Sequence, residues 1–166
     1  TVVDIGVFGI LAAVTGAIFA WLGGRADRAR GPKPVIVTCV AILTLVSLLV
    51  ITVTPGTVLL IPVAEGSALP DIAFYVLGAV IGAAGGALQA SSRTMLVRLV
   101  VVDPVTEGFG LYALAGKATA FIAPLSIGFV TYISGSQQIG ILPIVGLFII
   151  GLVLLIWVKP EGEVAP

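Results

Sequence analysis

The feature that most constrains this chain is a series of five apolar stretches, each long enough to cross a membrane. A helix rises about 1.5 Å per residue, so roughly 20 apolar residues span the hydrocarbon core of a bilayer. The five stretches lie at about 4–22, 35–53, 71–90, 109–131 and 138–158. The sequence therefore predicts an all-α membrane protein, folded as one domain of five transmembrane helices over residues 1–166.

The composition agrees with this prediction and excludes several classes of protein. Hydrophobic residues make up 59% of the chain and charged residues only 10%, whereas a soluble domain carries about 25% charged residues. A formal net charge of +0 argues against nucleic-acid binding. With no His and one Cys, we expect no metal site, no cofactor, no disulfide framework and no catalytic site, so the chain is not predicted to be an enzyme.

The basic residues predict the orientation of the five spans. Cations follow the first span, at residues 25–33, and the third span, at Arg93 and Arg98, and one more, Lys159, follows the last span. The segments 54–70 and 132–137 between the other spans hold none. Because cytoplasmic loops are enriched in Lys and Arg, the N-terminus is expected outside and the C-terminus in the cytoplasm.

The eighth basic residue, Lys117, lies well inside the fourth predicted span. A lysine at such depth costs about 2.5–3.5 kcal/mol on insertion scales, so its ammonium group needs water or a polar partner. Its side chain either snorkels to the interface or lines a polar cavity, and the depth favours the cavity. Gly116 and Pro124 lie on the same span and weaken its helix.

Two other segments carry features of possible functional weight. Gly78, Gly82 and Gly86 are spaced four apart, which puts them on one helix face and lets another helix approach closely. Gln89 follows, and its amide either bonds a neighbouring helix or faces a solute path. Residues 23–33 hold four cations and Asp27. They are explained by topology alone or by an Asp-Arg hinge that locks one conformation through charge pairing.

Several motifs resemble the major facilitator superfamily, and in particular its vacuole-effluxer branch. The Gly23-x-x-x-Asp27-Arg28 pattern is similar to the cytoplasmic loop motif of that superfamily. The branch is indicated by GGALQASSR at 85–93, by EGFGLYALAGKAT at 107–119 followed by Pro124, and by GSQQ at 135–138. This branch is related to the autophagy-linked vacuolar amino-acid exporter and includes many bacterial proteins.

The resemblance implies twelve helices in two halves, each built from inverted repeats. Five spans with an outside start would be helices eight to twelve, so the chain is expected to be the C-terminal part of a transporter whose N-terminal half is missing. It implies alternating-access transport of a small solute, with amino acids as candidates and export as one direction, across the cell membrane of a prokaryote. The implied solute-binding residues are Lys117, Gln89 and Tyr112. The implied gating residues are Gly23, Asp27 and Arg28.

A second function remains open from the residues alone. A five-helix membrane protein can serve as a scaffold or assembly subunit, and the face of Gly78, Gly82 and Gly86 would then contact another chain. The two hypotheses differ in their partners: a small solute and the missing half for a transporter, or further protein subunits for a scaffold. Both place the chain in a lipid bilayer.

Overall fold

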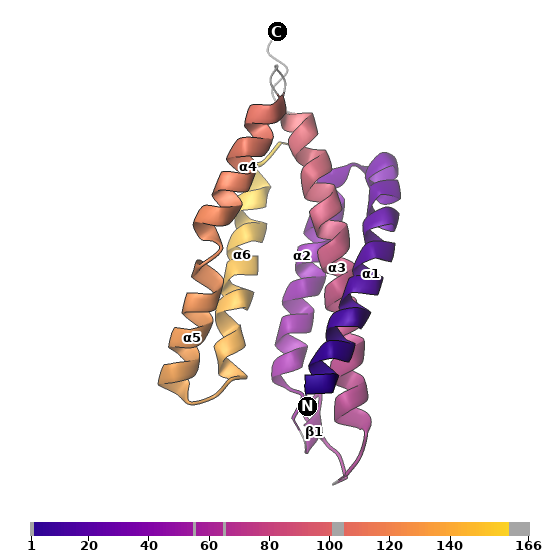
Figure 1. Cartoon of the computed structure of the whole chain (residues 1–166), viewed down its shortest axis with the longest axis vertical. Coiled ribbons are helices and arrows are strands. Elements are labelled where there is room, and N and C mark those ends of the chain that lie inside the picture. The colour runs from indigo at the N-terminus through magenta and orange to yellow at the C-terminus, as the bar shows by residue number, and fades with distance from the viewer. Residues whose placement is uncertain (1, 55, 65, 101–104, 160–166) are drawn as a thin grey trace.

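Five helical segments long and apolar enough to cross a membrane make up the computed structural model, which confirms the predicted all-α class. The structure describes residues 2–54, 56–64, 66–100 and 105–159 (Figure 1). Its elements are α1 (Val2–Arg30), α2 (Pro32–Ile51), β1 (Thr57–Val58), β2 (Ile61–Pro62), α3 (Leu69–Leu99), α4 (Val105–Thr119), α5 (Ile122–Ser134), the short 3-10 helix η1 (Ile139–Ile141) and α6 (Leu142–Trp157).

Helix α1 continues well past the predicted end of the first span. It passes through Gly23 and Gly24 and stops at Arg30, so most of the expected basic loop is helix. The reversal occurs at Gly31, whose φ of 81° is a left-handed conformation that glycine adopts without steric cost. Pro32 then starts α2, where a missing backbone N–H leaves no hydrogen bond unmade. Helix α3 likewise runs beyond residue 90, so Arg93 and Arg98 lie on a helix and not in a loop.

The fourth predicted span is divided into two helices. Helix α4 ends at Thr119 and α5 begins at Ile122. Pro124 explains the break, because its ring lacks an N–H and clashes with the carbonyl group four residues earlier, that of Ala120. At the break, the backbone N–H of Ala120 bonds to the carbonyl oxygen of Lys117, only three residues earlier, at 3.4 Å. The weakness that the sequence predicted here is therefore confirmed as a discontinuity.

The face of Gly78, Gly82 and Gly86 packs against α1, which confirms the predicted close approach of two helices. A Cβ atom at Gly82 would overlap the backbone of Ala12, and one at Gly86 would overlap the backbone of Gly16. These contacts lie within one chain. They leave no room on this face for a helix of another subunit, so the contact surface expected for a scaffold is already occupied.

The apolar core lies between α2 and α3, and α6 covers it from the side of α2. Its buried residues are Ile36, Cys39, Val40, Leu43, Ala84, Ala87 and Met95, with Phe148 and Leu152 of α6 packed against them. Lys33 ties the start of α2 to the end of α6, because its Nζ donates to the carbonyl oxygens of Val158 at 2.7 Å and Ile156 at 3.3 Å. A cation is favourable at these helix-terminal carbonyls.

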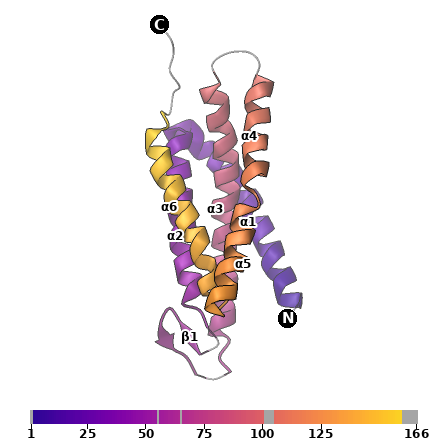
Figure 2. The ribbon, with the colours of Figure 1, turned by 90° about the vertical axis from the view of Figure 1, so that its left-hand side faces the viewer.

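The connections gather at two opposite ends of the bundle. Figures 1 and 2 place the N-terminal end of α1, the β1–β2 hairpin and the turn between α5 and α6 at one end. The α1–α2 reversal, the end of α3 and the end of α6 lie at the other. The apolar segment 58–64 is too short to span a membrane and contributes to this antiparallel hairpin, in which Val58 pairs with Ile61.

Candidate functional site

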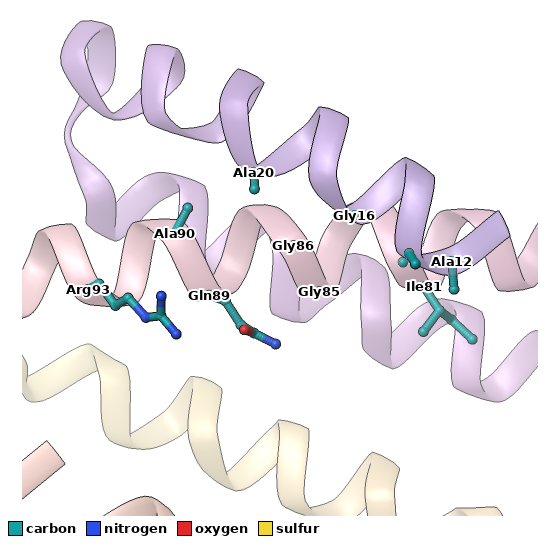
Figure 3. Close-up of a pocket in the computed structure, with 11 residues that line it drawn as sticks. Ala12, Gly16, Ala20, Ile81, Gly85, Gly86, Gln89, Ala90 and Arg93 are labelled. Carbon is teal, nitrogen blue, oxygen red and sulfur yellow. The ribbon is translucent and has the colours of Figure 1, made fainter. Parts of the chain in front are cut away.

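A pocket of about 460 Å³ opens along one side of the α1–α3 pair. Small residues from both helices form its wall, as Figure 3 shows: Ala12, Gly16, Ala20, Gly85, Gly86 and Ala90. The lack of bulky side chains at these positions creates the space. Its volume lies in the range of about 300–1,000 Å³ that small-molecule sites occupy.

Gln89 and Arg93 are the polar residues in the lining of this pocket. They stand one helical turn apart on α3, and both side chains point away from α1 (Figure 3). Neither side chain makes a hydrogen bond or ion pair with the described part of the chain. The Gln89 amide thus faces the pocket and bonds no neighbouring helix among the described residues.

Tyr112 joins α4 to α3 just beyond this pocket. Its hydroxyl group lies 2.9 Å from the Ser92 Oγ atom, and either oxygen can be the donor. Ser92 and Arg93 are neighbours on α3, so this bond brings Tyr112 of α4 near the polar end of the pocket.

Lys117 lies on α4 with its side chain exposed and does not line the Gln89 pocket. It makes no hydrogen bond or ion pair through its side chain with described residues. It sits in the last turn of α4, where the helix dipole and carbonyls without helical partners favour a cation. The division of the span thus offers a physical reason why a lysine is tolerated at this depth.

Gln89 and Lys117 lie at similar depths, although no contact joins them. Gln89 precedes the end of α3 at Leu99 by ten residues, and Lys117 follows the start of α4 at Val105 by twelve. These separations correspond to about 15 and 18 Å of helix. The two helices run in opposite directions from the same end of the bundle (Figure 2). Both residues therefore lie far from that end along the helix axes.

Asp27 is a buried polar residue near the C-terminal end of α1, where this helix packs against α3. Its side chain is only 2% exposed. Ser91 Oγ, itself fully buried, donates to Asp27 Oδ1 at 2.8 Å. The second carboxylate oxygen, Oδ2, is buried and has no hydrogen-bond partner among the described residues. A buried carboxylate oxygen that lacks a partner is costly, which marks Asp27 as a candidate for a state-dependent contact.

The other two expected gating residues differ sharply in their surroundings. Gly23 is buried one turn before Asp27, and a Cβ atom there would lie 3.1 Å from the Cα and Cβ atoms of Ala87. Arg28 is exposed and has no partner in the described ranges. The Asp-Arg charge pairing, one of the two explanations of this segment, is not made in this structure, because Asp27 is buried against α3 whereas Arg28 is exposed. Arg98 does approach, but its Nη2 atom donates to the Asp27 backbone carbonyl at 3.5 Å.

Sequence reasoning missed Arg93 and Ser91 as site residues. The sequence predicts that the third span ends near residue 90, which places Arg93 outside it, although its position one turn after Gln89 is a usable signal. Ser91 bonds a residue 64 positions away, and no local pattern indicates such a partner.

The fold and these sites define a multispanning helical membrane protein with a divided helix and a polar pocket. The chain belongs to the vacuole effluxer Atg22-like family, whose model matches residues 9–163. This match confirms the resemblance inferred from the motifs.

The chain is also similar to a relative that is described as an MFS-type transporter. The chain is 31% identical over 88 residues to the uncharacterized MFS-type transporter YxiO of Bacillus subtilis (strain 168). The aligned segment covers 53% of this chain and only 21% of the relative's length. No solved structure is significantly similar to the chain.

Proposed function

We propose that this chain forms part of a secondary transporter that moves a small solute across a membrane by alternating access. The observation that carries the proposal is the pocket on α3, in which Gln89 and Arg93 stand without described partners at the edge of a wall of small residues. Membership of the effluxer family supports it. Transporter sites commonly combine such a cavity with a discontinuous helix, and α4–α5 supplies one here.

Solute contact is assigned to Gln89, Tyr112 and Lys117, with Arg93 added from the structure. A solute that carries a carboxylate group suits the cations of Arg93 and Lys117 and the amide of Gln89, so amino acids are the proposed substrates. Lys117 would contact the solute only after α4 closes towards α3, because Lys117 and Gln89 lie at similar depths but do not line the same pocket. Closure of α4 would break few contacts, since its described side chains are almost all exposed and it packs only lightly against α3.

The proposed orientation follows from the end at which the cations gather. The last turns of α1 carry Arg25, Arg28 and Arg30, and the last turn of α3 carries Arg98. Lys159 follows α6 at the same end of the bundle (Figure 1). We assign this end to the cytoplasm. The opposite end, with the β1–β2 hairpin, then faces outwards.

The test is transport by the protein expressed from its complete reading frame and reconstituted in liposomes. We expect counterflow of at least one amino acid above the level of empty liposomes, measured with and without a pH gradient. If no amino acid moves while the reconstituted protein retains a cooperative thermal transition, the proposed substrate class is wrong. If no member of a wider panel of small solutes moves either, the proposed transport function fails.

The gate is proposed at Asp27, supported by Gly23 and by Arg28. Helix α1 is tied to α3 at both ends, by the Asp27–Ser91 bond and by the bond from the Tyr75 hydroxyl to Asp4 Oδ1 at 3.0 Å. Glycine contacts hold the middle, so the two helices would move as one body. The buried Oδ2 atom has no described donor in this state, so we assign its donor to another facing state, in which a group from outside the α1–α3 pair would reach it. A group that binds two states unequally shifts their populations.

Replacing Asp27 by Asn is expected to slow transport about fivefold or more without lowering membrane abundance. Asn keeps the acceptor for Ser91 but removes the charge, and a change of about 1 kcal/mol in the balance of states corresponds to that factor. Initial rates of solute flux, normalised to protein in the liposomes, measure the effect. Asp71→Asn is the control, because Asp71 is exposed in the first turn of α3. Wild-type kinetics in Asp27→Asn would contradict the proposed gate.

A further inference from the structure

A second pocket, of about 630 Å³, lies at the junction of α1 and α2 and is unrelated to the groove that holds Gln89. Three cationic residues line it: Arg30 from the last turn of α1, Lys33 from the first turn of α2, and Arg98 from the last turn of α3. Residues from three different helices therefore bring positive charge to one cavity.

Among the residues that the structure describes, no acidic side chain lines this pocket. Arg30 makes no hydrogen bond or ion pair within the described ranges. Arg98 donates to one backbone carbonyl, that of Asp27, and its Nη1 atom lies 3.8 Å from the position that a Cβ atom would occupy at Gly31. The carboxylate of Asp27 accepts its bond from Ser91. The guanidinium groups thus retain most of their five N–H donors for a ligand.

The start of α2 adds to the positive potential. Its N-cap residue, Gly31, offers no side-chain cap, and no acidic residue lies in its first turn. The positive end of the helix dipole is therefore left uncompensated. Lys33 is held in place by two carbonyls of α6 and retains one of its three N–H donors.

We propose that this pocket binds a phosphate group, carried by an anionic phospholipid at this end of the bundle. Phosphate oxygens accept paired hydrogen bonds from arginine, and two arginines flank a lysine whose position is already fixed. The pocket lies where helices end, which is the level of lipid headgroups. A bound phosphate would join α1, α2 and α3 at the reversal, where the N–H of Gly31 bonds the backbone carbonyl oxygen of Asp27.

The experiment is native mass spectrometry of the protein from its complete reading frame, titrated with phosphatidylglycerol or with phosphatidylcholine. We expect tighter binding of phosphatidylglycerol, with affinity falling about tenfold in Arg98→Gln, the loss of one charge-assisted contact. Arg25→Gln is the matched control. Arg25 lies on α1 towards the same end of the bundle, its guanidinium carbon is 4.7 Å from the centre of the Trp21 ring, and it does not line the pocket.

The outcomes separate the possible sources of the phosphate. Competition by millimolar inorganic phosphate that disappears in Arg98→Gln supports a phosphate site that also accepts free anions. Absence of such competition, with lipid binding still dependent on Arg98, supports a headgroup site. Equal losses in Arg25→Gln and Arg98→Gln would show general surface attraction and overturn the proposal, as would unchanged lipid affinity in the double variant Arg30→Gln, Arg98→Gln.

Discussion

Gly86→Ala is expected to destabilise the protein by about 3 kcal/mol or more, although alanine is the better helix former. The new Cβ atom would overlap the backbone of Gly16 on α1. Backbone cannot rotate aside as a flexible side chain can, so α1 would have to move away from α3 along its length. The midpoint of thermal unfolding in detergent measures the effect, at about 2–4 °C per kcal/mol for a chain of this size.

Gly85→Ala is the matched control for this prediction. Gly85 is the preceding residue on the same helix, and a Cβ atom there would meet nothing within 4 Å. Its substitution should leave the unfolding temperature unchanged or raise it slightly, because alanine loses less backbone entropy on forming a helix. Equal stability of the two variants would mean that α1 and α3 are not packed as the structure shows.

Lys117→Gln is expected to reduce transport about tenfold or more while membrane abundance stays equal or rises. Removing a charge from the interior of a span relieves an insertion cost of about 2.5–3.5 kcal/mol. The proposed solute contact, in contrast, loses a charge-assisted hydrogen bond of about 1.5–3 kcal/mol. Stability and transport should therefore change in opposite directions, which a merely structural role would not produce. Flux in liposomes and abundance in membranes are measured on the same preparations.

Two further variants define what the Lys117 result means. Lys117→Arg retains the charge and should keep more transport than Lys117→Gln. Ser126→Ala on α5 is the neutral control, because the Ser126 hydroxyl bonds only carbonyls of its own helix, those of Ile122 at 2.7 Å and Ala123 at 3.0 Å. Unchanged flux in Lys117→Gln at wild-type abundance would favour a lysine that snorkels to the interface.

Much of the fold could be predicted because membrane spans depend on local composition. In hydrocarbon every backbone polar group must bond within its own segment, so a long apolar stretch becomes a helix whatever surrounds it. The glycine spacing at 78, 82 and 86 predicted a close helix contact, and Pro124 predicted a weak point, by equally local rules. The positions of helix ends near water were predicted less well, as α1 and α3 show, because polar residues there are compatible with either helix or loop.

The sequence by itself determined the class of this protein, its family and its five spans, since hydropathy, residue spacing and motif runs are properties of neighbouring residues. Only the tertiary structure decided which side chains meet. It placed Ser91 against Asp27 across 64 positions, set Gln89 and Arg93 in one pocket, and assembled Arg30, Lys33 and Arg98 from three helices. The reason is physical: these arrangements depend on how helices pack side by side, and small residues on α1 and α3 set that packing through contacts between distant parts of the chain.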